Sequence, residues 1–309
     1  RVDPMPPLPA PSLGPAGGGC DDGRVALCFL TSARAADAAS NGGGSPLFND
    51  AAWQWLAEDF TERSGIAFDD AFLVLRHDDS APGPVAGGFL ARAEHVAAVP
   101  TRRATLSLVF AELRLIHRSL ASGCRYMVLL SESCLPLCPL DVLRSELLAG
   151  GRSVLQYHHC RGGHQRLFDI RFGALQWKAW RREELEVLAN LEEDALEARW
   201  RIHEEGLAKY NLAPDEVVLV NELHRLAGSL EARCDRRPST HVEWETDTDV
   251  ARSGPRHARV FRDGVPDAAW AARGATCALL CRKVAPLTPV ALAAWQGRLA
   301  QERVPGGVE

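Results

Sequence analysis

Continuous apolar runs alternate along the first half of the chain with runs whose apolar residues recur three and four positions apart. Runs of the first kind predict buried parallel strands, and they are 24–32 (RVALCFLTS), 71–79 (AFLVLRHDD) and 126–130 (YMVLL). Runs of the second kind predict amphipathic helices closed by a glycine, and they are 50–65 and 105–123. This order predicts an α/β fold with a parallel sheet, whose ligands bind at the carboxyl ends of the strands.

The second half of the chain has weaker patterns. It predicts helices at 139–149, about 178–209, 213–229 and 288–302, and strands at 153–158, 239–245 and 275–283. The helix at 213–229 has a defined start, because Pro214 stands in its first turn beside the acidic residues Asp215 and Glu216.

Composition divides the chain into one domain and two ends. Residues 1–23 are rich in proline and glycine and predict a disordered stem, and residues 304–309 predict a frayed tail. Residues 24–303 form the predicted domain, and the chain is 46% apolar, which is enough for a sizeable core. Because the chain starts at Arg1 without an initiator methionine or a signal-peptide core, we expect it to be a trimmed piece of a longer protein.

The charge balance argues against two classes of partner. The formal net charge is -5 at pH 7, whereas binding to nucleic acid or to an anionic membrane surface needs clustered positive charge. No run approaches the roughly 20 apolar residues that span a bilayer. We therefore expect no nucleic acid partner and no membrane contact from this chain itself.

The chain has nine cysteines, at positions 20, 28, 124, 134, 138, 160, 234, 277 and 281. The close pairs, Cys134 with Cys138 and Cys277 with Cys281, lie in apolar surroundings, which argues against structural zinc. We expect buried free thiols together with one or more disulfides in an oxidising compartment.

The polar loop after the third strand, Ser131-Glu132-Ser133-Cys134, is the first candidate site. A nucleophilic Ser133 would need the Gly-x-Ser-x-Gly elbow, and neither glycine is present. A dyad of Cys134 with a downstream histidine is an alternative, since the sequence has His158, His159 and His164. The simplest interpretation is a polar loop that follows a core strand.

Two acidic strings, HDD at 77–79 and DTD at 247–249, resemble carboxylates that hold a divalent metal, but such strings are also common in loops. Histidines at 157–164 (YHHCRGGH) lack helical spacing and favour the edge of a pocket over a metal site. We expect no bound metal.

Glu216 and a group of late basic residues are the remaining candidates. A carboxylate in the first turn of a helix compensates the helix dipole, and the alternative role is that of a general base beneath an acceptor hydroxyl. The basic residues are Arg256, Arg259, Arg262, Arg282 and Lys283, which either neutralise a diphosphate or are simply solvated.

Taken together, SLVFAELRLIHRSLASGCRYMVLLSESCLPL (107–137) resembles the core-2/I-branching β-1,6-N-acetylglucosaminyltransferase family (glycosyltransferase family 14), especially its plant and algal branch. In that branch an ERRLL helix leads to F-x-LLSESCIPL. Three further blocks follow in the same order: 171–188 is similar to KGSQWF…R, 213–223 to DEHYFPTLL, and 275–284 to CFLFARKF. The departures are LQW in place of SQW and valines after the acidic pair.

The resemblance implies a mixed sheet of the Rossmann-like glycosyltransferase-A type, flanked by helices. It also implies an inverting transfer of N-acetylglucosamine or a related sugar from a UDP-sugar to a hydroxyl of a glycan or glycoprotein, without a metal or other cofactor. By position in the family, Glu216 is the general base, and Lys283 with Arg256 neutralises the diphosphate, with Arg259 and Arg282 as neighbouring candidates.

Trp244 matches an aromatic residue that lines the acceptor sugar in the family, and Trp177 and Asp215 are the other candidate acceptor contacts. The candidate nucleotide and sugar contacts are assigned by their place at the carboxyl ends of the predicted strands: Thr31, His77 and Asp78 after the first two, and Ser131, Glu132 and Ser133 after the third. The family further implies a lumenal Golgi enzyme held by an N-terminal membrane anchor that this chain does not contain. A non-catalytic glycan-binding relative and, less favoured, a Cys- or Ser-dependent hydrolase remain as alternatives.

Overall fold

The structure is a computed structural model that describes residues 23–31, 49–78, 88–102, 104–160, 169–209, 212–244 and 258–302. The predicted stem and tail therefore lie almost entirely outside the described residues. Within the described ranges, no helix is both long and apolar enough to cross a bilayer.

A seven-stranded mixed sheet forms the centre of the molecule, in the order β10-β6-β9-β4-β1-β2-β3. Its strands are β1 (Val25–Thr31), β2 (Phe72–Asp78), β3 (Glu94–His95), β4 (Tyr126–Ser131), β6 (Ser153–Val154), β9 (Ala179–Arg181) and β10 (Cys234–Asp235). β9 is antiparallel to its neighbours β4 and β6, whereas every other pair in the sheet is parallel. β1 and β4 are almost wholly buried, which explains why they read as continuous apolar runs.

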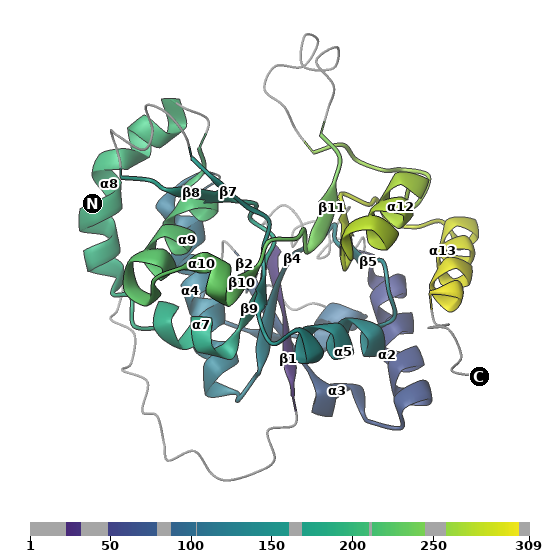
Figure 1. The fold of residues 1–309 in the computed structure, drawn as a ribbon. Coiled ribbons are helices and arrows are strands. Elements are labelled where there is room, and N and C mark those ends of the chain that lie inside the picture. The colour runs from purple at the N-terminus through teal and green to yellow at the C-terminus, as the bar shows by residue number, and fades with distance from the viewer. Residues whose placement is uncertain are drawn as a thin grey trace.

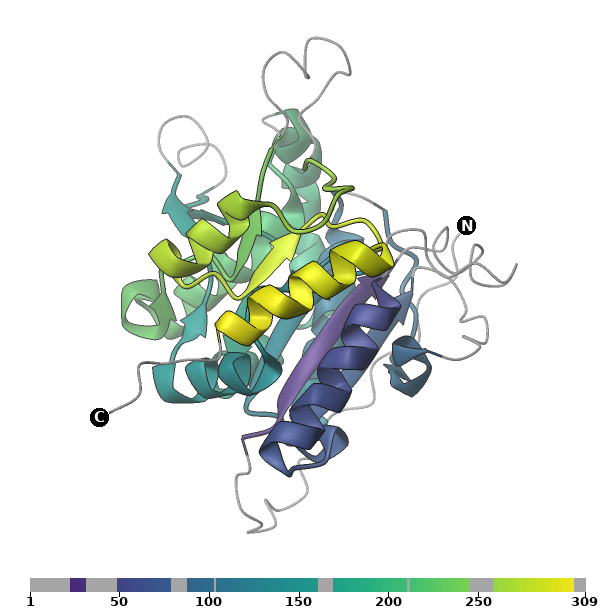
Figure 2. The ribbon, with the colours of Figure 1, turned by 90° about the vertical axis from the view of Figure 1, so that its right-hand side faces the viewer.

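Helices cover both faces of this sheet (Figure 1). On one side lie α4 (Leu106–Ala121), α7 (Arg182–Leu188), α8 (Glu193–Lys209) and α9 (Pro214–Ala227), and on the other lie α2 (Asp50–Ser64) and α5 (Leu140–Gly150). The last helix, α13 (Pro289–Gln301), lies against α2 through an edge-to-face contact between Trp55 and Trp295 (Figure 2). Burial of one stripe of each helix holds the layers together, as at Trp53, Leu56 and Phe60 of α2.

Shorter elements complete the described fold. They are the helices α3 (Phe68–Ala71), η1 (Phe89–Arg92), α10 (Leu230–Arg233) and α12 (Asp267–Thr276), and two small sheets. One small sheet has the order β11 (Thr240–Val242), β12 (Leu280–Arg282), β5 (Leu135–Pro136), and the other pairs β7 (Tyr157–His159) with β8 (Phe172–Ala174). Because β5 follows β4 at once, the first small sheet stands at the carboxyl end of β4.

The structure confirms the predicted strands of the first half and the predicted helices at 50–65, 105–123, 139–149, 213–229 and 288–302, within a few residues at each end. Three predictions in the second half are wrong. The strand predicted at 153–158 is two strands, β6 and β7. The helix predicted from 178 begins with β9, and of the strand predicted at 275–283 only 280–282 form a strand, β12, after the end of α12. In each case a short buried apolar run has no readable period, so it does not distinguish helix from strand.

The cysteines form no disulfide among the eight that the structure describes. Seven of these thiols are buried and Cys277 is exposed, while Cys20 lies outside the described residues. The expectation of buried free thiols is met at these positions, and that of a disulfide finds no support among them.

Candidate active site at the carboxyl edge of the sheet

The order of the strands reverses at β1. The chain runs from β1 outward to β2 and β3, and then returns to place β4 on the other side of β1. At the carboxyl ends of these strands, Thr31 pairs with Asp78 and Leu30 with Ser131, so predicted residues from all three strands share one edge. Parallel α/β sheets bind ligands outside such a reversal point.

Two of the predicted nucleotide contacts at this edge are occupied by the protein itself. Asp78, which is 2% exposed, accepts a hydrogen bond from Thr31 Oγ1 and forms an ion pair with Arg76 (2.9 Å), and Nε2 of His95 lies 3.2 Å from the same carboxylate. Burial lowers the pKa of His77 to about 4, so the ring is neutral and its Nε2 accepts the backbone N–H of Val99 at 2.9 Å. His77 and Asp78 therefore brace the strand ends, and Thr31 is the partly exposed member of the three.

Beyond β4, four other predicted residues converge. The Oγ of Ser131 lies 3.1 Å from the Oγ of Ser133 and accepts a hydrogen bond of 3.1 Å from Nε of Arg282 on β12. The guanidinium of Arg282 stacks on the ring of Trp177, 4.3 Å from the centroid. Trp177 is only 5% exposed, so in this structure it supports Arg282 by a cation–π contact and presents little surface to an acceptor sugar.

The loop between β4 and β5 is held rigidly by distant parts of the chain. Val284 donates its backbone N–H to the carbonyl of Ser133 (3.0 Å), and Asn49 in turn donates to the carbonyl of Val284 (3.1 Å). Trp53 donates its indole N–H to the carbonyl of Cys134 (3.2 Å). This loop therefore fixes the hydroxyls of Ser131 and Ser133 in place, while Glu132 between them is half-buried.

The buried thiol of Cys134 does not have the surroundings of a nucleophile. Its side chain is fully buried, and burial raises its pKa above the ordinary value. Reactive cysteines instead have a lowered pKa and some access to solvent. Burial and pKa thus both weigh against a Cys134-dependent hydrolase.

The amino end of α9 presents Asp215 and Glu216. Pro214 occupies the first turn and Ala213 provides no side-chain cap. Asp215 is 5% exposed, whereas Glu216 is half-buried, as a base that must meet a substrate would have to be.

A buried ion pair that the sequence analysis did not single out supports this end of α9. Lys178 donates from Nζ to the carbonyl of Asp215 (3.0 Å) and to the carboxylate of Glu112 on α4 (3.1 and 3.3 Å), and the indole N–H of Trp180 also donates to Glu112 (2.8 Å). Both charged side chains are 1% exposed. A lone cation opposes the dipole at a helix amino end, and Glu112 neutralises it.

Trp177 and Lys178 join the two halves of the site. Trp177 contacts Arg282, and the next residue, Lys178, contacts the first turn of α9 that carries Glu216. The carbonyl of Trp177 also accepts the hydroxyl of Ser239 at 2.7 Å. The adjacent residues Trp177 and Lys178 therefore connect Arg282, the predicted cation, to the helical turn that carries Glu216, the predicted base.

Three further predicted residues lie beside β12. The backbone N–H of Lys283 donates to the carbonyl of Arg259 (3.4 Å), and Arg259 forms a loose ion pair with Glu243 (3.7 Å). Trp244, which is 46% exposed, pairs its backbone with Ala258. Arg256 lies outside the described residues, as do Asp79, His164 and the string at 247–249.

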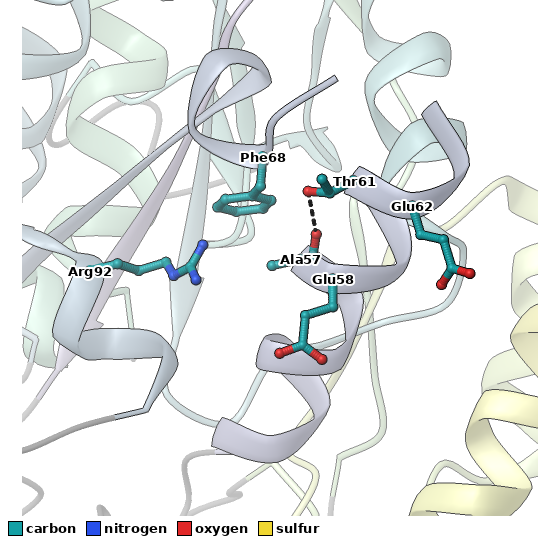
Figure 3. A pocket seen from close by; sticks show the side chains of 6 residues that line it. All are labelled: Ala57, Glu58, Thr61, Glu62, Phe68 and Arg92. Carbon is teal, nitrogen blue, oxygen red and sulfur yellow. Dashed lines mark hydrogen bonds between the residues drawn. The ribbon is translucent and has the colours of Figure 1, made fainter. Parts of the chain in front are cut away.

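Two pockets in the described part of the protein lie away from these residues. The first, of about 360 Å³, opens between α2 and η1 beside Phe68 and Arg92, at the amino end of β2 (Figure 3). Its acidic residues belong to α2, and the side chain of Glu62 points away from the opening, so no constellation of reactive groups faces it. The second, of about 400 Å³, lies between α8 and α9.

The described residues contain no group of three or more His, Cys, Asp or Glu side chains that could hold a metal ion. A scan against protein-family models and a search of curated proteins each found no match for this chain.

Proposed function

We propose that this protein is an inverting glycosyltransferase of the glycosyltransferase-A type, which transfers N-acetylglucosamine or a related sugar from a UDP-sugar to a hydroxyl of a glycan or glycoprotein. The observation that carries the proposal is the convergence of Ser131, Ser133 and Arg282 at the reversal point of the sheet, joined through residues 177–178 to the first turn of α9. The resemblance of the 107–137 and 275–284 segments to the family adds to it.

In the proposed reaction, Glu216 accepts the proton of the acceptor hydroxyl as the oxygen attacks the anomeric carbon. The new bond forms on the face opposite UDP, while the bond from the anomeric carbon to the diphosphate oxygen breaks and its electron pair leaves with UDP. Arg282 and Lys283, with Arg256 or Arg259 from an earlier segment, would neutralise the departing diphosphate. Two fixed cations at this place would perform the task for which other enzymes use a divalent metal.

The same proposal assigns the substrate contacts. Thr31, Ser131, Glu132 and Ser133 would face the UDP-sugar from the carboxyl ends of the strands, and the exposed indole of Trp244 would stack on an acceptor sugar. We further propose that the full-length protein is held in the Golgi membrane by an anchor outside this chain, with this domain in the lumen.

A panel of UDP-sugars, assayed for release of UDP with and without an acceptor glycan, tests the function. We expect release with one donor, enhanced by an acceptor, and unchanged by EDTA. Complete loss of activity in EDTA would contradict the metal-independent mechanism, and absence of release with every donor would contradict catalysis.

A non-catalytic glycan-binding protein is the second candidate, because Trp244 offers an exposed aromatic surface in either case. Calorimetry with UDP separates the two, since a protein that only binds glycans has no need of the nucleotide. Binding of UDP that depends on Arg282 supports the transferase, and glycan binding without UDP binding supports the second candidate.

A further inference from the structure

The pocket between α8 and α9 is lined by an unusual concentration of charged side chains. Its wall carries three arginines, Arg171, Arg199 and Arg225, and two carboxylates, Asp169 and Glu222. With histidines taken as neutral, these five groups have a net charge of +1, and two histidines in the same wall can only add positive charge. The volume of about 400 Å³ is in the range of small-molecule sites.

Glu222 organises the arginines but has no bonding capacity left for a ligand. It is 1% exposed and accepts five hydrogen bonds of 2.7–2.9 Å, two from Arg199, two from Arg225 and one from the indole of Trp200. Burial alone would raise the pKa of Glu222, but the bonds from Trp200, Arg199 and Arg225 outweigh it and lower the pKa below its ordinary value. The carboxylate is therefore ionised and saturated.

The arginines, in contrast, keep donors for another partner. The side chains of Arg199 and Arg225 are 45% and 49% exposed. Among the described residues, Nε and Nη2 of Arg199 and Nη1 of Arg225 have no acceptor. Arg171 on the opposite wall is 55% exposed, and in the part of the chain that the structure describes its side chain pairs with the exposed Asp169 at 3.8 Å, a weak pair.

This pocket is separate from the candidate active site. Arg225 follows Glu216 by nine positions along α9, which corresponds to about 13 Å and two and a half turns of helix. The two residues therefore face opposite sides of α9, and a ligand in the pocket would not touch the first turn. Figure 1 shows α8 and α9 at the end of the molecule away from α12 and α13.

From this arrangement we propose that the pocket between α8 and α9 binds a small oxyanion, a carboxylate, sulfate or phosphate group carried on a molecule no larger than a monosaccharide. Guanidinium groups fixed by a buried carboxylate are preorganised for such a group, because they recognise oxyanions through paired N–H donors. Arg171 closes the site from the side of β8.

Titration of the full chain with sodium sulfate, at ionic strength held constant with sodium chloride, tests this proposal. The indole N–H resonance of Trp200, assigned by comparison with Trp200→Phe, reports from the floor of the pocket. We expect a saturable shift of this resonance, and about 3- to 10-fold weaker binding in Arg171→Gln. Arg201→Gln is the matched control, because Arg201 is an equally charged, 72% exposed residue of the same region that pairs with Glu197 and does not line the pocket.

Parallel titrations with inorganic phosphate and with glucuronate identify the source of the oxyanion. Tighter binding of glucuronate than of sulfate would assign the pocket to an acidic sugar, and the reverse order would assign it to a free or esterified inorganic anion. A Trp200 resonance that responds to none of the three anions would overturn the proposal, as would equal weakening in Arg171→Gln and Arg201→Gln. Because the readout uses no transfer reaction, its failure is independent of the proposed enzyme activity.

Discussion

Two buried glutamates form ion pairs at α9, one near each end of the helix. The two pairs differ in how exposed their cations are. Glu112 and Glu222 are each 1% exposed, and each accepts an indole N–H, from Trp180 and Trp200 respectively. The cation paired with Glu112 is Lys178, itself 1% exposed, whereas the cations paired with Glu222 are half-exposed arginines.

Because the exposure of the cations differs, the two networks can have different roles. At the amino end of α9 both charged side chains are buried. Lys178 also donates a hydrogen bond to the carbonyl of Asp215, so this network can only position the helix. At the carboxyl end the arginines reach solvent, so the network can also meet a ligand. Both networks pair a buried glutamate with cations and an indole N–H, and the solvent exposure of the cations separates a structural role from a binding role.

The largest expected effect on stability comes from breaking the buried ion pair between Lys178 and Glu112. Lys178→Met should destabilise the protein by about 3–5 kcal/mol, because it leaves the carboxylate of Glu112 buried without a cation. Urea unfolding measures the free energy. If the protein then fails to fold, the double variant below still decides the point.

The double variant Glu112→Gln/Lys178→Met should be more stable than Lys178→Met alone, since the amide oxygen of Gln still accepts the indole N–H of Trp180 and no charge stays buried. A double variant at least as unstable as Lys178→Met would contradict a coupled ion pair at this end of α9.

Acidification should have the next largest effect on the free energy of unfolding, because it protonates His77, which is buried in its neutral form. The pKa of His77 is lowered from 6.5 to about 4 by burial, so the unfolded chain binds the proton more readily. The free energy of unfolding should therefore fall as the pH falls from about 6.5 to about 4, by about 3 kcal/mol from this residue. Urea unfolding across that range measures the change.

His77→Gln is the control, because a glutamine oxygen can accept the N–H of Val99 and does not titrate. The variant should lose less stability than wild type between the two pH values. The same pH dependence in both proteins would show that His77 is not the group responsible.

The smallest effect is expected at the open network. Arg225→Gln should cost about 1 kcal/mol, because Glu222 keeps its bonds to Arg199 and Trp200 and the lost side chain was half-exposed. Arg201→Gln on the surface should stay within about 0.5 kcal/mol of wild type. If Arg225→Gln lost as much unfolding free energy as Lys178→Met, the distinction between the buried network at Glu112 and the exposed network at Glu222 would be contradicted.

The sequence predicts the first half of the fold well, because buried strands and amphipathic helices differ in length and period there. β9 escapes prediction because its first two residues, Ala179 and Trp180, are buried and follow two other buried positions, Trp177 and Lys178, without alternation. A lysine between two tryptophans and a glutamate on the apolar face of α4 were signals that could have indicated a buried ion pair.

The sequence predicts individual residues of the candidate site, but not the residues that contact them. Ser131 follows a strand, and Glu216 opens a helix, which the sequence shows directly. The contact of Arg282 with Ser131 joins residues 151 positions apart, and that of Lys178 with Glu112 joins residues 66 apart. Such pairings depend on tertiary packing, so the sequence does not show that Val99 bonds to His77 or that Arg282 stacks on Trp177.

UDP release by Glu216→Gln, with UDP affinity and the free energy of unfolding determined on the same sample, tests whether Glu216 is the general base. Asp267→Asn is the matched control, because it removes an acidic residue from the first turn of α12. We expect turnover lower by about 10²- to 10⁴-fold in Glu216→Gln, with UDP affinity and stability close to those of wild type, and little change in Asp267→Asn. Turnover within tenfold of wild type in Glu216→Gln would contradict the role of Glu216 as the base.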